Sequence, residues 1–183
     1  MQPLLIVGLG NPERQYLNNR HNIGFMVLDA LASNLSLTFK EDKNFKSYVA
    51  KNSELILCKP TTYMNLSGEA VLALKNYFRI EDVFVVHDDL DLPLGELKFK
   101  KGGGNGGHNG LKSIDKLCGS EYYRARCGIG RPESKELVAS YVLGDFPTHP
   151  SDLITSCTQA LETFISSRDF SLLQNQYTHK VKQ

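Results

Sequence analysis

The sequence has no long apolar run: none approaches the roughly 18 to 20 residues that a membrane-spanning helix needs. The basic segment of a secretory signal is missing as well, because Met1 leads directly into the apolar residues 4–7. We therefore expect neither a membrane anchor nor export, and we expect a cytoplasmic protein.

Cysteine is scarce and scattered. The four cysteines stand at positions 58, 118, 127 and 157 and form no CxxC pair. This spacing indicates neither a zinc site nor a disulfide framework, and reduced thiols agree with a cytosolic location.

A large net charge is absent too, and the value of +1 argues against an unspecific polyanion binder. The charge is nevertheless uneven along the chain. Residues 81–97 include six acidic residues and no Lys or Arg, whereas residues 98–131 include eight basic residues and two acidic ones. An acidic segment therefore adjoins a basic one.

The composition is that of a folded protein. With 183 residues, 41% hydrophobic and 22% charged, it excludes a disordered, collagen-like or coiled-coil chain and predicts one domain over residues 1–183. Strand-like and helix-like periodicities alternate, which predicts an α/β fold with a twisted mixed, largely parallel sheet covered by helices on both faces. Strands are expected at residues 4–9, 47–51, 54–59, 83–86, 96–101 and 124–129, and helices near 25–35, 70–77, 110–117, 150–165 and 172–177.

Polar residues follow three of the apolar strands. Asn11 follows the first, Asn65 follows the strand that Pro60 is expected to stop, and His87 and Asp88 follow residues 83–86. Ligands of parallel α/β sheets bind beyond the carboxyl ends of the strands. We therefore expect a polar pocket where these three ends meet.

Two glycine motifs resemble nucleotide-binding patterns without matching them. Residues 8–13 begin like GxGxxG but end in Glu13, and residues 106–113 resemble a Walker A loop but carry Leu111 where a glycine must precede the lysine. The glycine-rich residues 102–110 nevertheless lie between lysines and open a helix. Their backbone N–H groups would suit a phosphate or a substrate carbonyl, although a flexible connector is the alternative.

His21 precedes the helix expected from about residue 25. A helix N-terminus disfavours an imidazolium and so keeps the ring neutral, as a general base requires, while a carboxylate on the other ring nitrogen would fix the tautomer and offset the loss of basicity. Asp88 is the best placed carboxylate. The alternative is a partly exposed histidine at a helix end.

The acidic residues after residue 87 could instead bind a divalent metal ion through Asp88, Asp89 and Asp91. No HExxH motif or distant His/Asp cluster supplies further ligands, so the pairing of a histidine with an aspartate is favoured. Ser67 has no GxSxG context, which leaves a base that activates water as the simpler chemistry.

Five segments then carry a resemblance to a known family: IVGLGNP at residues 6–12, RHNIG at 20–24, KPTTYMNLSG at 59–68, HDDLD at 87–91, and the glycine-rich residues 102–112. In this order and spacing the chain resembles bacterial peptidyl-tRNA hydrolases over nearly its whole length. The resemblance implies a monomer that hydrolyses the ester between a peptide and the 3′-terminal ribose of tRNA, without a metal or organic cofactor.

The resemblance also implies roles for single residues. His21 would be the catalytic base, with Asp88 as its orienting partner. An asparagine amide can donate to a carbonyl oxygen and accept from a peptide N–H, so asparagines suit this substrate. The pocket residues implied are Asn11, which would be catalytic, and Asn65 and Asn109, with Tyr16 and Met64 beside them.

The basic segment would bind the nucleic acid. Two of its residues match family positions that hold tRNA phosphates, and three more would widen the patch, with little selectivity for base sequence. The first two are Lys100 and Arg126, and the others are Lys98, Lys101 and Lys112. The chain departs from the family pattern at Glu13, Asn105 and Cys127.

Two other functions remain open at this point. One is a non-catalytic RNA-binding protein of the same fold, which would bind RNA without turnover. The other is a metal-dependent phosphohydrolase, which would lose all activity in EDTA.

Overall fold

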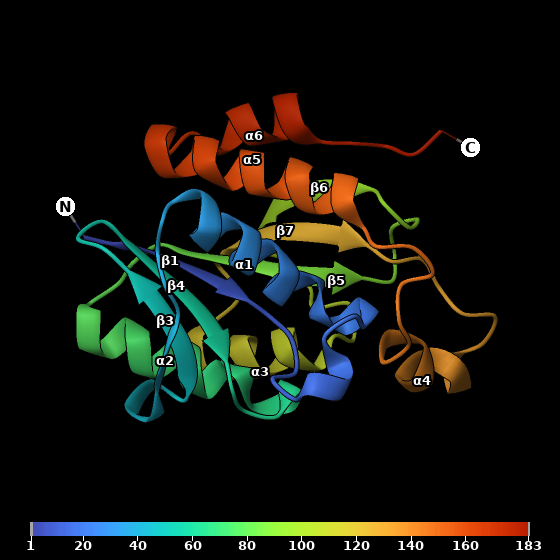
Figure 1. Ribbon diagram of the computed structural model, residues 1–183, viewed down its shortest axis with the longest axis horizontal. Coiled ribbons are helices and arrows are strands. Elements are labelled where there is room, and N and C mark those ends of the chain that lie inside the picture. Colours follow the sequence, from blue (N-terminus) through green and yellow to red (C-terminus); the bar gives the residue numbers. More distant parts are fainter. Residues whose placement is uncertain (1, 183) are drawn as a thin grey trace.

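The computed structural model describes residues 2–182, whose strands form one seven-stranded sheet in the order β2-β3-β4-β1-β5-β7-β6 (Figure 1). Strands β4, β1, β5 and β7 are parallel neighbours, while the pairs β2-β3, β3-β4 and β6-β7 are antiparallel. The expected mixed, largely parallel sheet is confirmed. The strands are β1 Leu4–Gly8, β2 Lys40–Asp42, β3 Ser47–Lys51, β4 Leu55–Pro60, β5 Val83–Asp89, β6 Leu97–Lys101 and β7 Tyr123–Gly128.

Helices cover both faces of this sheet. Their bounds are α1 Ile23–Asn34, α2 Ser67–Phe78, α3 Asn109–Cys118, α4 Val138–Val142, α5 Ser151–Ser167 and α6 Phe170–Tyr177. Helices α1, α5 and α6 lie on one face and α2 and α3 on the other, while the short α4 stands near the end toward which β5 and β7 point (Figure 1).

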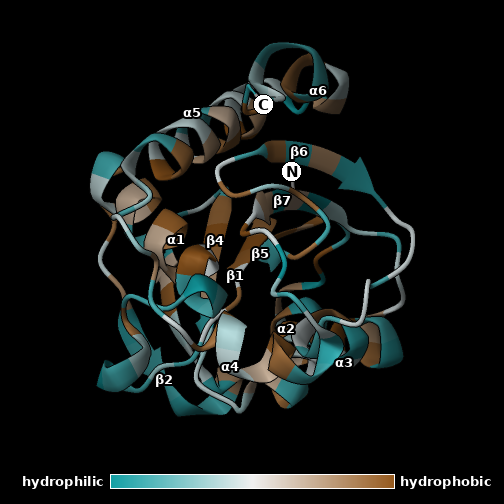
Figure 2. Cartoon of the chain, turned by 90° about the vertical axis from the view of Figure 1, so that its right-hand side faces the viewer, coloured by the Kyte–Doolittle hydropathy of each residue, from teal (hydrophilic) through white to brown (hydrophobic). Residues whose placement is uncertain are grey.

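The two hydrophobic cores explain why the central strands β1 and β5 consist mainly of apolar residues. On β1, Leu4 and Ile6 belong to the core under α1 and α5, whereas Leu5 and Val7 belong to the core over α2 and α3. Successive strand residues point to opposite faces, so a strand buried on both faces has no polar side. Figure 2 shows these strands in brown inside a more hydrophilic shell.

The observed elements differ from the expected ones mainly at their ends. β5 continues past Val86 to Asp89, because its last residues pair with β7. Pro60 is the last residue of β4 instead of stopping the strand before it, Pro150 precedes α5 instead of lying within it, and α6 begins at Phe170. The elements β2 and α4 were not expected, because three and five residues are too few to show a periodicity.

Helix α1 is seated on β1 by a close backbone approach. A methyl group at Gly8 would lie 2.3 Å from the carbonyl oxygen of Gly24, and one at Gly24 would lie 2.4 Å from the nitrogen of Leu9. Both positions therefore require glycine, and the start of α1 is fixed against the end of β1. Across residues 2–182, none of the helices has the length and hydropathy that crossing a membrane requires.

Candidate active site

The carboxyl ends of β1, β4 and β5 lie at one edge of the sheet, since the three strands are parallel neighbours. Asn11 follows β1, the loop that contains Asn65 follows β4, and His87 and Asp88 are on β5 itself. The expected meeting of these strand ends is therefore confirmed. What remains is how their side chains are arranged.

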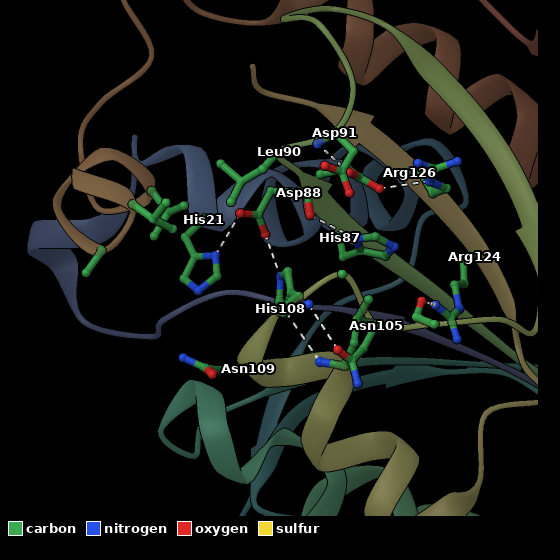
Figure 3. Close-up of a pocket in the computed structure, with 18 of the residues that line it drawn as sticks. His21, His87, Asp88, Leu90, Asp91, Asn105, His108, Asn109, Arg124 and Arg126 are labelled. Carbon is green, nitrogen blue, oxygen red and sulfur yellow. Dashed lines mark hydrogen bonds and ion pairs between the residues drawn. The ribbon is translucent and has the colours of Figure 1, made fainter. Parts of the chain in front are cut away.

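His21 and Asp88 are in direct contact, as expected. His21 lies in a 3-10 turn, Arg20–Asn22, immediately before α1, and its Nδ1 is 2.8 Å from Oδ2 of Asp88 (Figure 3). Both residues are buried. In a neutral His21 the proton therefore resides on Nδ1 and is donated to Asp88, so Nε2 keeps the lone pair that a general base needs.

The environment makes His21 a stronger base than an ordinary histidine. Burial alone would lower its pKa, but the charge of Asp88 and the hydrogen bond to it raise the pKa above 6.5. Asp88 thus more than offsets the effect of burial. A larger share of His21 is protonated near neutral pH than in a free histidine.

His108 is a site residue that the sequence did not point to. Its Nε2 lies 2.7 Å from Oδ1 of Asp88, so one carboxylate bridges two histidines whose ring centroids are 4.9 Å apart (Figure 3). Its Nδ1 accepts hydrogen bonds from the backbone N–H groups of Gly110 and Leu111 at 3.0 and 3.3 Å and so caps α3. These donors require an unprotonated Nδ1, so Nε2 carries the proton that is donated to Asp88.

Asp88 is an ionised carboxylate throughout the physiological range. Burial would raise its pKa, but the two histidines outweigh burial and hold the pKa well below the usual value of 3.8. The neighbouring His87 is different: burial lowers its pKa to about 4. His87 Nδ1 donates to the carbonyl oxygen of Asp88 at 2.8 Å, and His87 is therefore neutral at pH 7.

A cavity of about 540 Å³ opens beside this network. It brings together five of the residues to which the resemblance assigned a catalytic or binding role, from β5, β6, β7, the turn before α1 and the start of α3. The glycine-rich loop and the α4 residues Val138, Ala139 and Val142 form other walls. The five are His21, Asp88, Lys100, Asn109 and Arg126.

The remaining predicted pocket residues do not line this cavity. Asn11 is nevertheless tied to the turn that carries His21: Asn22 accepts from the Asn11 N–H at 2.8 Å and donates to its carbonyl oxygen at 2.9 Å. Met64 is buried and its sulfur packs on Gly110, while Asn65 beside it is exposed. Tyr16, in a 3-10 turn, is half-buried.

The acidic residues near the cavity have cationic partners. Arg126 Nε donates to Asp89 at 2.8 Å, and Arg131 pairs with Asp91. These pairs make an Asp88, Asp89 and Asp91 metal site less suitable. A different set could present ligand atoms to a metal ion, since atoms of His21, Asp88 and His108 lie within 4.8 Å of one another. Hydrogen bonds at 2.7 and 2.8 Å already account for that proximity.

The basic side chains do not all share one face. Lys98 lies opposite Arg126 and Lys100 opposite Arg124 across β6 and β7, so these four share a face of the sheet. Lys101 lies opposite Tyr123, with its Nζ 4.9 Å from that ring, on the other face. The fifth predicted lysine, Lys112, is exposed on α3.

The chain is similar to proteins of one family over nearly its whole length. The family model described as peptidyl-tRNA hydrolase matches residues 5–183. A Helicobacter pylori peptidyl-tRNA hydrolase is 49% identical over 180 residues, covering 96% of this chain and 95% of that protein, and one from Rickettsia canadensis is 48% identical over 157 residues, covering 82% and 85%. The crystal structure of the Acinetobacter baumannii peptidyl-tRNA hydrolase superposes with a TM-score of 0.90 at 35% identity, covering 97% of this chain and 95% of that one. The chain therefore belongs to the peptidyl-tRNA hydrolase family.

Proposed function

We propose that this chain hydrolyses the ester between a peptide and the 3′-terminal ribose of tRNA, with His21 as the general base. The observation that carries the assignment of the base is the buried contact between His21 Nδ1 and Asp88, which leaves Nε2 as the basic nitrogen. A base of this kind takes a proton from water as its oxygen attacks.

In the proposed reaction, the water oxygen bonds to the ester carbon while its proton moves to Nε2 of His21. The carbonyl oxygen becomes an oxyanion, and an amide N–H of Asn109 or Asn11 is suited to stabilise it. The imidazolium is stabilised by the Asp88 carboxylate. When the ester bond breaks, Nε2 returns the proton to the leaving ribose oxygen, which yields free tRNA and the peptide acid. The acid then loses its remaining proton to solvent and becomes a carboxylate.

The other predicted residues have roles in substrate binding. Asn65, Tyr16 and Met64 do not line the cavity and would contact the peptide beyond the ester. Lys100 and Arg126 line the cavity and would bind phosphates of the acceptor stem near the 3′ end. Lys98 and Lys112, together with Lys101 on the other sheet face, would extend the contact.

The proposal also covers the oligomeric state, the location and the metal content of the protein. We expect residues 1–183 to act as one unit, as a cytoplasmic monomer, without a bound metal. Size-exclusion chromatography with light scattering tests the oligomeric state, and a mass of twice 20.5 kDa would contradict it.

The deciding experiment measures the release of a labelled peptide from peptidyl-tRNA. His21→Ala should lower the rate by about 10² to 10⁴-fold, because a general base contributes about that much. His149→Ala removes an exposed histidine beside α5 and is the matched control. Equal release by the wild type and His21→Ala would end the assignment of the base. Tight, salt-sensitive RNA binding by a wild type without turnover would support the RNA-binding alternative.

A further inference from the structure

Arg124, on β7, is a buried arginine beneath the glycine-rich loop. It is 2% exposed, and its guanidinium carbon stands 4.6 Å from the centre of the Tyr122 ring. Nη2 donates to the carbonyl oxygen of Gly103 at 2.8 Å, and Nη1 donates to that of Gly104 at 2.5 Å. The nearest carboxylate oxygen, on Asp115, is 3.9 Å from Nη2. The loop carbonyls are therefore the main partners of this buried charge.

The loop is also held from the side of α3. Asn105 Nδ2 donates to Oδ2 of Asp115 at 3.3 Å, and the Tyr122 hydroxyl donates to the other oxygen of Asp115 at 2.7 Å. Asn105 further accepts from the N–H of Gly107 at 3.0 Å. Arg124 on β7 and Asp115 on α3 thus bind neighbouring positions of the loop.

The glycine-rich loop has few side chains of its own that could stabilise its conformation. Four of its glycines have positive φ, between 59° and 94°, at Gly102, Gly103, Gly106 and Gly107. Glycine offers no side chain to pack and admits many backbone conformations. The observed conformation therefore depends on partners outside the loop, of which the Arg124 fork is the most deeply buried.

The position of the loop bears directly on Lys100. A methyl group at Gly103 would lie 2.4 Å from both Cε and Nζ of Lys100, so the lysine side chain lies against the bare backbone of Gly103. Lys100 and the loop line the same cavity as His21. A shift of the backbone at Gly103 would therefore move Lys100, whereas the contact between His21 and Asp88 includes no atom of the loop.

We propose that Arg124 is a positioning residue for tRNA binding: its two donors hold the backbone at Gly103 and Gly104, and this backbone sets the place of Lys100 in the cavity. The proposal rests on the proposed function, because it takes the ligand of Lys100 to be a tRNA phosphate. Arg124 itself touches no substrate in this scheme.

The test compares two substrates of one enzyme. The first is a full-length peptidyl-tRNA, and the second is the same peptide esterified to a short CCA-ended oligonucleotide, which has no acceptor-stem phosphates. Arg124→Lys keeps a buried charge but not the planar fork that reaches two carbonyl groups. We expect Arg124→Lys to raise KM for the full-length substrate about tenfold. It should change kcat for either substrate, and KM for the short substrate, by less than about twofold.

A second variant tests the loop without changing the buried charge. Gly103→Ala should show the same split between the two substrates, because its methyl group displaces Lys100 and an alanine is strained at a φ of 94°. Gly104→Ala adds the same methyl group one residue further, where no heavy atom lies within 4 Å, and should raise KM for the full-length substrate much less. The midpoint of thermal unfolding of each variant identifies those that fold.

The outcomes separate the two proposals. A wild type that hydrolyses neither substrate contradicts the proposed function. With an active wild type, normal binding of the full-length substrate by either Arg124→Lys or Gly103→Ala overturns the role of Arg124. An equal loss on both substrates also overturns it, since general damage to the fold would do this. If Arg124→Lys does not fold, Gly103→Ala decides whether the backbone at Gly103 sets the place of Lys100, as the proposed role of Arg124 requires.

Discussion

Oδ1 of Asp88 lies 2.7 Å from Nε2 of His108, so the carboxylate that orients His21 is itself held by a second histidine. The backbone of α3 fixes the other nitrogen of His108. The orientation of His21 thus depends on β5 and α3 together. We therefore expect different effects from substitutions of Asp88 and of His108.

Asp88→Asn should weaken the base and shift its titration. The charge of Asp88 raises the pKa of His21, so in the wild type kcat/KM should fall as the pH decreases through a value above 6.5. Without that charge the pKa decreases, so the acid limb should move to lower pH. The limiting kcat/KM should drop by about 10² to 10⁴-fold, because a weaker base and a mobile ring both reduce catalysis.

The measurement is a pH profile of kcat/KM for both proteins. Asp82→Asn, at an exposed carboxylate, serves as the control and should reproduce the wild-type profile. An acid limb at the same pH in the wild type and Asp88→Asn would show that His21 is not the titrating group.

His108→Asn should separate the two roles of His108. Asparagine is a good N-cap, so the cap of α3 is kept and the free energy of unfolding should change by less than about 1 kcal/mol. Its side chain is too short to keep the hydrogen bond to Asp88, and loss of one charge-assisted hydrogen bond should reduce kcat about tenfold.

His108→Ala removes the cap as well and should cost about 1 kcal/mol of stability in urea unfolding. If His108→Asn has full activity while folding normally, the contact with Asp88 has no part in the reaction.

Treatment with EDTA should leave the activity unchanged. The ring nitrogens nearest to Asp88 are at hydrogen-bond distance from it, and the other nitrogen of His108 accepts from the α3 backbone, so the protons of these groups explain the cluster. Activity is measured after dialysis against EDTA and again after adding Zn²⁺ or Mg²⁺. Loss of activity that one of these ions restores would assign the cluster of His21, Asp88 and His108 to metal binding instead.

Gly8→Ala should destabilise the whole fold. The added methyl group would lie 2.3 Å from a backbone oxygen of α1, which cannot move without lifting the helix. We expect a loss of about 3 kcal/mol in the free energy of unfolding, at the upper end for an overpacked core. Urea unfolding of Gly104→Ala is the control, with an expected change of about 0.5 kcal/mol or less. Equal midpoints for both variants would contradict the close packing of α1 on β1.

Much of the architecture could be predicted because burial on both faces leaves a strong mark in sequence. The run that became β1 and the first four residues of β5 are apolar, and α1 and α5 repeat their buried residues at helical spacing. The polar end of β5 was missed, because Asp88 and Asp89 pair with β7 although no apolar pattern continues there.

The site was predictable in part for the same kind of reason. His21 and Asp88 stand next to an expected helix and an expected strand end, so the alternation of elements brought them to one edge. His108 was missed, because it lies within the glycine-rich residues 102–110, for which the prediction concerned the backbone N–H groups and not a side chain. Arg124 counted only as one more basic residue, and its burial of 98% could not be inferred from its neighbours Tyr123 and Ala125.

The hydrophobic pattern of the sequence shows which side of each helix and strand packs against the core. This pattern was enough to place His21 and Asp88 at the same edge of the sheet. Which atoms then bond is a matter of distance between segments remote in the chain, such as His21 and Asp88, 67 residues apart. A hydrogen bond depends on tenths of an ångström, and residue order alone does not set separations that finely. The folded chain sets them through the packing of α1 on β1 and of α3 beside β5.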